Sequence, residues 1–137
     1  MGKYTIKDLH HVVEQKMRPP ECDITMKVEV ISANDGVAHG IWKVDQRFLN
    51  GHGVVMGGFI SAAVDIIMAY AIASKLRNNQ QFTSIDLDTT FHRPTMEGDV
   101  ELIATVERKG RSIAYVTAKV KQEQKLVASC VSSIMIS

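Results

Sequence analysis

Residues 59–73, FISAAVDIIMAYAIA, form the longest apolar run of the chain and decide its fold. If this run is helical, apolar side chains point in every direction around the helix axis, so the helix requires burial on every side. We therefore predict a buried helix over about residues 58–76. In a chain of 137 residues, only a sheet that wraps around this helix can bury it.

The segments on either side of the helix alternate apolar and polar residues, as half-buried strands do. Before the helix, residues 24–32 and 37–44 alternate in this way, and Asn34-Asp35-Gly36 between them is a hairpin signal. After the helix, the pattern predicts four further strands, over residues 83–92, 100–108, 113–122 and 126–136. Short turns join the last three strands into an antiparallel meander. The prediction is an α+β fold with an antiparallel sheet wrapped around a long central helix.

The N-terminal segment, residues 1–20, contains a predicted amphipathic helix over residues 5–17. Thr5 is suited to cap this helix, and Asp8 lies in its first turn. The expected apolar face carries Ile6, Leu9, Val13 and Met17. Pro19-Pro20 ends the helix because proline cannot continue it. Since no linker or internal repeat interrupts the sequence, residues 1–137 are expected to form one domain.

Sixteen Lys and Arg residues balance fifteen Asp and Glu residues, which leaves a net charge of +1. Nucleic-acid and membrane-surface proteins carry a strong positive excess, so neither kind of partner is expected. The two cysteines and five histidines have no metal-ligand spacing, and no metal is predicted. The N-terminus lacks the apolar core of a signal peptide, and the apolar run is shorter than the ~20 residues of a membrane span. A cytoplasmic location is therefore expected.

Asp65 is the one charged residue inside the apolar run. The residues three and four positions away supply no opposite charge; they are Ser61, Ala62, Met68 and Ala69. A carboxylate in such surroundings must be paired, hydrogen-bonded or functional. Two interpretations remain open: a catalytic carboxylate, or a structural aspartate that is hydrogen-bonded across a subunit interface.

The loop before the helix, NGHGVVMGG over residues 50–58, is rich in glycine. Gly57 and Gly58 expose backbone N–H groups at the positive end of the helix dipole, which suits a developing oxyanion, although a glycine pair is also common in a tight turn into a helix. Asn50, His52 and Ser84 are polar candidates near the helix, and each is also ordinary in a loop or strand. No Gly-x-Ser-x-Gly elbow, phosphate-binding loop or dinucleotide fingerprint is present.

The pattern Asn50-x-x-Gly53-x-x-Met56-Gly57-Gly58, followed by Asp65, resembles the loop and helix of hotdog-fold acyl-CoA thioesterases of the PaaI-like, phenylacetate-degradation type. Residues 83–99 resemble the next strand and turn of that family, and residues 106–136 resemble its last three strands. The resemblance covers about residues 24–137. It implies a single hotdog thioesterase domain that hydrolyses acyl-CoA to a carboxylate and free coenzyme A.

The resemblance also implies roles for the site residues. Asp65 is the implied general base or nucleophile, and the Gly57 N–H polarises the thioester carbonyl. Asn50 positions water or the thioester, and Ser84 supports the hydrolytic water. Substrate contacts are implied for Met56, His52, Gly58, Arg93, Lys109, Gly110 and Arg111, of which the lysine and the arginines suit coenzyme A phosphates. No cofactor is implied, since coenzyme A is part of the substrate.

Met56 stands where the family usually has histidine. A thioether cannot donate a hydrogen bond, and loss of one donor to the transition state costs roughly 10²–10³ in rate. His52 could supply the donor instead, or Met56 could line an apolar acyl pocket. The alternatives are therefore a non-catalytic acyl-CoA or lipid-binding hotdog protein, and a purely structural oligomeric domain.

Gly57 and Asp65 are eight residues apart, about 12 Å along a helix that rises ~1.5 Å per residue. Groups that act on the same carbonyl must lie within about 3–3.5 Å of it, so one chain is not expected to supply both. We predict a site that two copies share across a two-fold axis. The assembly would be a homodimer or, by the family resemblance, a homotetramer built as a dimer of dimers.

Overall fold

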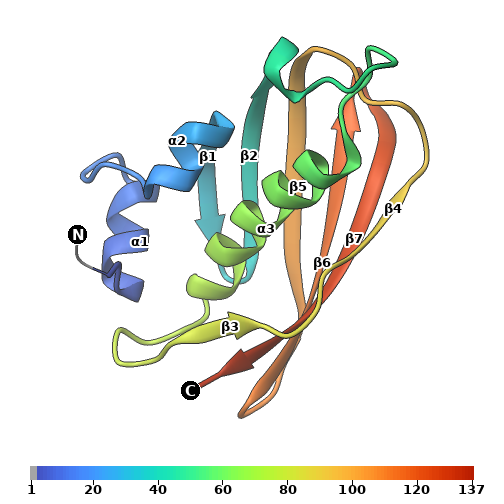
Figure 1. Ribbon diagram of the computed structural model, residues 1–137. Coiled ribbons are helices and arrows are strands. Elements are labelled where there is room, and N and C mark those ends of the chain that lie inside the picture. Colours follow the sequence, from blue (N-terminus) through green and yellow to red (C-terminus); the bar gives the residue numbers. More distant parts are fainter. Residues whose placement is uncertain (1–2) are drawn as a thin grey trace.

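The computed structural model describes residues 3–137, which form one curved antiparallel sheet, a long helix on its concave face and two short helices at one side (Figure 1). The helices are α1 (Ile6–Val13), α2 (Glu21–Met26), the 3₁₀ turn η1 (Gln46–Phe48) and α3 (Gly57–Ala73). The strands are β1 (Val28–Asn34), β2 (Val37–Val44), β3 (Phe82–Ser84), β4 (Asp88–Phe91), β5 (Gly98–Lys109), β6 (Ile113–Gln122) and β7 (Lys125–Ile136). The sheet order is β1-β2-β5-β6-β7-β3, and β4 also pairs with β7.

The predicted α+β fold, with a sheet wrapped around a long helix, is confirmed. α3 lies diagonally across the sheet in Figure 1 and buries side chains such as Ala63, Val64 and Ile67 completely. Helix and sheet approach closely at Gly40 of β2, where a Cβ atom would lie 3.0 Å from the Ile67 side chain. The apolar run is thus the centre of the core.

Burial of α3 on every side is wrong for a single chain. Asp65 and Gly58 are exposed, and Ser61, Ala62 and Ala69 are only partly buried. These residues follow helical spacing and form one strip along α3, which we call the open strip. The sheet covers one side of the helix and the N-terminal helices another, so the open strip is the side that one chain leaves uncovered.

The hairpin and the meander are as predicted. Asp35 and Gly36 have φ values of 47° and 84°, the left-handed backbone that a two-residue hairpin turn requires. β5, β6 and β7 pair in sequence, and the predicted inward residues of β5 and β6 are buried, except that Val106 is only partly so beside a bulge.

Two boundaries near the N-terminus differ from the prediction. α1 has the expected cap, in which Thr5 and Asp8 exchange hydrogen bonds, but it ends at Val13 and leaves Met17 outside the helix. Residues 24–26, expected in a strand, belong to α2. Pro20 precedes the first turn of α2, and Lys27 ends it in the left-handed conformation, so β1 starts only at Val28.

The strand predicted over residues 83–92 is divided into β3 and β4. Between them, Asp86 is held to β7 by side-chain hydrogen bonds. The Ser132 hydroxyl donates to the Asp86 carbonyl, and the Ser133 N–H donates to the Asp86 carboxylate, each at 2.7 Å. These contacts replace ladder bonds, so the single apolar face expected along Ile85 and Phe91 is broken and both side chains are exposed.

Candidate active site

Asp65 lies in the middle of α3 and projects from the open strip. It lines a depression of about 330 Å³ between α3, β3 and the two N-terminal helices. The lining includes Leu9, Cys22, Asp65, Tyr70, Phe82 and Ser84, and we call it the Asp65 depression. Asp65 and Ser84, predicted to act together, are therefore brought to one place by α3 and the end of β3.

The surroundings of Asp65 disfavour its charge. The carboxyl reaches solvent in the single chain, but the apolar helix around its base removes much of its hydration. This burial raises the pKa of Asp65 above its ordinary value, and hydrogen bonding with the Ser84 side chain opposes the rise without cancelling it. A carboxyl with a raised pKa beside a hydroxyl is a suitable proton acceptor near neutral pH.

The other predicted residues lie around the start of α3. Met56 is the N-cap residue, with an extended backbone and no side-chain hydrogen bond to the helix. Its side chain is 44% exposed and its terminal methyl lies near Gly58. The N–H groups of Gly57 and Gly58 open the first turn, where helical N–H groups have no partner within the helix.

Phe91 covers the start of α3, a contact that the sequence analysis did not foresee. A Cβ atom on Gly57 would lie 2.7 Å from the Phe91 ring. A side chain at position 57 would therefore require the half-exposed Phe91 ring to shift. Together with Val54, Ile60, Arg93 and Thr95, these residues line a second hollow of about 400 Å³, the Gly57 depression.

Asn50 has the turn-forming role that was one of its two interpretations. Its side-chain oxygen accepts hydrogen bonds from the N–H groups of His52 at 2.9 Å and Val54 at 3.4 Å. The Asn50 amide nitrogen is not needed for these bonds and can serve a ligand. His52 is exposed at the tip of the same loop.

The cationic candidates divide between the two ends of the sheet. Arg93 lines the Gly57 depression. Lys109 ends β5, and Gly110 and Arg111 follow it in the β5–β6 turn, where the Gly110 N–H donates to the Ile113 carbonyl at 2.8 Å. This turn lies next to Ala114 of β6. Ala114 and Ser84 occupy the same row across the sheet, because both pair with the same residue of β7. The turn and Ser84 are therefore at one end of the sheet, away from Phe91.

Apart from those of the β5–β6 turn, the predicted residues thus form two groups on one chain. The first group lies at the start of α3, in the loop before it or beside it, and comprises Asn50, His52, Met56, Gly57, Gly58 and Arg93. The second group comprises Asp65, two turns further along α3, and Ser84 of β3 beside it. Gly57 and Arg93 line the Gly57 depression, and Asp65 and Ser84 line the Asp65 depression. The other predicted residues line neither of the two. No group of His, Cys, Asp and Glu side chains within residues 3–137 is arranged to hold a metal ion.

Asp23 and Tyr70 are buried residues of the Asp65 depression that the sequence analysis missed. The Tyr70 hydroxyl donates to the Asp23 carboxylate at 2.5 Å, and both residues are almost inaccessible to solvent. Burial raises the pKa of Asp23, and hydrogen bonds from Tyr70 and Cys22 oppose the rise. Proline followed by acidic residues, Pro20-Glu21-Cys22-Asp23, is a helix-start signal that could have indicated α2.

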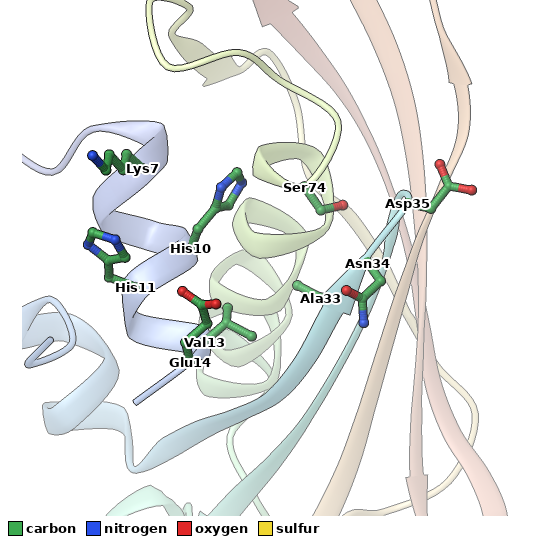
Figure 2. A pocket seen from close by; sticks show the side chains of 9 residues that line it. All are labelled: Lys7, His10, His11, Val13, Glu14, Ala33, Asn34, Asp35 and Ser74. Atoms are coloured by element: carbon green, nitrogen blue, oxygen red, sulfur yellow. The ribbon is translucent and has the colours of Figure 1, made fainter. Parts of the chain in front are cut away.

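A further pocket, of about 440 Å³, lies between α1, the β1–β2 hairpin and the end of α3 (Figure 2). His10 points from α1 toward the end of α3, and its Nε2 donates to the Ala73 carbonyl at 3.0 Å. Lys7, His11 and Glu14 line the same pocket. It contains none of the predicted site residues, and the partly buried contact of His10 joins α1 to α3.

Comparison with known proteins identifies the chemistry of the family. The family model for the thioesterase superfamily matches residues 52–129, more than half of the chain. PA0474 of Pseudomonas aeruginosa, whose name gives a provisional assignment as an esterase, is 27% identical over 88 residues. That match covers 64% of this chain and 66% of the relative, just under two thirds of its length.

Solved structures share the fold over nearly the whole chain. A phenylacetic acid degradation-related protein of Ralstonia eutropha JMP134, provisionally named a thioesterase, has a TM-score of 0.88 and 24% identity, and the match covers 93% of this chain and 98% of that one. The PaaI protein of E. coli has a TM-score of 0.82 and 22% identity, with 95% and 91% covered. The predicted resemblance is confirmed: the fold is the hotdog fold of these proteins. Within residues 3–137, no helix is long and apolar enough to cross a membrane.

The contact between Gly57 and Phe91 can be tested by substitution. Gly57→Ala is expected to lower the free energy of unfolding by about 1 kcal/mol, the low end of the cost of overpacking, because the new methyl group overlaps the half-exposed Phe91 ring. Phe91→Ala in the same chain should recover most of this loss, as measured by urea unfolding at fixed protein concentration. Gly51→Ala is the control, since a Cβ atom there meets nothing within 4 Å. Strictly additive losses in the double variant would show that Phe91 does not cover Gly57.

Proposed function

Because this chain belongs to the thioesterase superfamily, we propose that it hydrolyses acyl-CoA thioesters to a carboxylate and free coenzyme A, with Asp65 as the catalytic carboxylate. The observation that carries the proposal is the position of Asp65. It is the one charged side chain of an apolar central helix, it lines a depression, and Ser84 lies beside it.

The chemistry needs only groups of the chain and water. As general base, the Asp65 carboxylate takes a proton while water attacks the carbonyl carbon; the C–S bond then breaks and coenzyme A leaves as a thiolate that acquires a proton. As nucleophile, Asp65 instead forms an acyl-enzyme anhydride that water hydrolyses. In both routes Ser84 orients the carboxyl or the water, since its hydroxyl can donate and accept.

The Gly57 N–H is the proposed oxyanion donor, and a second copy of the chain must supply it. On one chain, Gly57 and Asp65 line separate depressions and are about 12 Å apart along α3. We propose a homodimer, within a dimer of dimers, in which the open strips of two α3 helices face each other. Each site then combines Asp65 and Ser84 of one copy with the Asn50–Gly57 loop of the other.

The proposed coenzyme A contacts follow from charge. Arg93 stands at the Gly57 depression, and its guanidinium can bind a phosphate with two hydrogen bonds. Lys109 and Arg111, on the β5–β6 turn, lie at the end of the sheet that carries Ser84. This turn and Arg93 can therefore bind the same coenzyme A molecule only if two copies of the chain bring opposite ends of their sheets together.

Met56 supports a second candidate function, a non-catalytic acyl-CoA-binding protein. Its side chain caps no N–H group and offers no hydrogen-bond donor at the start of α3. Where the resemblance implies a histidine, this chain has an exposed thioether that contacts Gly58. Release of free thiol from a panel of acyl-CoAs separates the candidates: binding without turnover of any of them would favour the second.

Asp65→Asn is expected to abolish hydrolysis while the fold and coenzyme A binding remain, since the amide has nearly the same shape but is neither a base nor a nucleophile.

The pH profile of the wild type gives an independent readout. The reaction needs the ionised carboxylate, so the raised pKa predicts that kcat/KM falls with decreasing pH at a value above that of an ordinary aspartate, about 3.9. Thiol release measured from pH 4 to 9 tests this.

A near wild-type rate in Asp65→Asn would make Asp65 structural. Coenzyme A binding is measured in the same preparation, so that a folding defect is distinguished from a catalytic one.

Met56→His is expected to raise turnover, because an imidazole at the start of α3 restores a donor that stabilises charge in the transition state. The gain should reach about tenfold or more, up to the roughly 10²–10³ that one such donor contributes. His52→Ala tests whether the neighbouring histidine already supplies that donor. If its rate is unchanged, His52 is excluded; if Met56→His gains nothing while His52→Ala is inactive, His52 is the donor.

A further inference from the structure

The Asp65 depression has an apolar lining to which the N-terminal segment, α3 and β3 all contribute. Leu9 of α1 and Pro20, just before α2, face Ile66 and Ala69 of α3 and Phe82 of β3. These side chains surround the space next to the Asp65 carboxyl, where the proposed reaction places the thioester. A ligand group in this space is therefore in contact with apolar carbon on several sides.

Charge decides which half of the substrate fits there. The charged side chains of this lining are both acidic, Asp23 and Asp65. The Gly57 depression instead carries the guanidinium group of Arg93. Phosphate groups are repelled by the first lining and attracted by the second, so the coenzyme A moiety belongs on the Gly57 side. The uncharged acyl group is left for the Asp65 depression.

α2 is fixed as one wall of this depression by a buried contact. Tyr70, on α3, donates its hydroxyl to Asp23 of α2 at 2.5 Å, and their exposed fractions are 2% and 4%. The Cys22 thiol, on the depression side of α2, donates to the other Asp23 oxygen at 3.4 Å. Because the contact is buried, its loss would leave a polar group without a partner, so it holds α2 at a set distance from α3.

We propose that α2 limits the length of the acyl group, with Cys22 and Pro20 as the wall that the acyl chain meets and the Asp23–Tyr70 hydrogen bond as the contact that holds this wall in place. The inference rests on the proposed function, since it assigns the acyl group of that reaction to the Asp65 depression. Cys22 and Pro20 are specificity-determining residues in this account, and Tyr70 is a positioning residue.

The test compares kcat/KM for saturated acyl-CoAs from acetyl to palmitoyl. Cys22→Trp adds bulk to the wall and should lower kcat/KM at least about tenfold for the longest substrate that the wild type hydrolyses, with less than about a twofold change for acetyl-CoA. Ile24→Trp is the matched control. It adds similar bulk to an exposed position of the same helix, outside the lining, and should leave the profile unchanged.

A second variant moves the wall in the opposite direction. Tyr70→Phe removes the hydroxyl that holds Asp23, so α2 should loosen and longer acyl chains should gain relative to short ones. Alkylation of Cys22 by N-ethylmaleimide reports on α2 without any substrate, because the other cysteine, Cys130, is buried. Its rate should rise in Tyr70→Phe.

The outcomes separate the two proposals. If the wild type releases thiol from no acyl-CoA, the proposed function fails and the assignment of the acyl group fails with it. If the wild type is active and the chain-length profiles of Cys22→Trp and Tyr70→Phe match that of the wild type, α2 does not limit the acyl group and only the further inference is overturned.

Discussion

The structure depends on the burial of α3. A helix with apolar side chains on all sides gains stability from each side that is covered, at about 25 cal/mol per Å² of apolar surface. The curved sheet covers the largest part, and close approach at Gly40 allows the helix to lie against β2. α1 and α2 cover a further part. A single chain leaves the open strip, with Asp65 at its centre, uncovered, so that another surface can bury it.

The same constraint gives the site its form. Because α3 is apolar, the Asp65 carboxylate is surrounded by apolar groups. This burial raises the pKa of Asp65 and makes its carboxylate a stronger base. The start of the helix, two turns away, offers N–H groups beside Gly57. A rigid helix cannot bring its own start to its own middle, so the geometry that buries α3 also favours a site made by two copies.

The sequence predicted the features that depend on local pattern. The long helix, the turn at Asp35 and Gly36, and the β5–β6–β7 meander each follow from periodicity or turn chemistry within a few residues. The broken strand depends on a contact between distant parts of the chain, since the strand predicted from residue 83 is interrupted where Asp86 binds β7. The start of α2 has a local signal in Pro20 and the acidic residues after it, but its contact with Tyr70 through Asp23 has none. The sequence pattern alone singled out Asp65, but the role of Ser84 beside it came from the family resemblance. Phe91 over Gly57 gave no signal because only the folded chain brings the two residues together.

The central claim, that one active site combines the Asp65 of one copy with the Asn50–Gly57 loop of another, is tested most directly by subunit mixing. An inactive Asp65→Asn chain is refolded with a chain inactivated in the loop, and formation of mixed dimers is verified. In a mixed dimer both lesions fall in one site and the other site is intact. Activity should return to about a quarter of the wild-type value, since half of randomly formed dimers are mixed and each has one intact site of two. Mixed dimers that form and remain inactive would contradict the account.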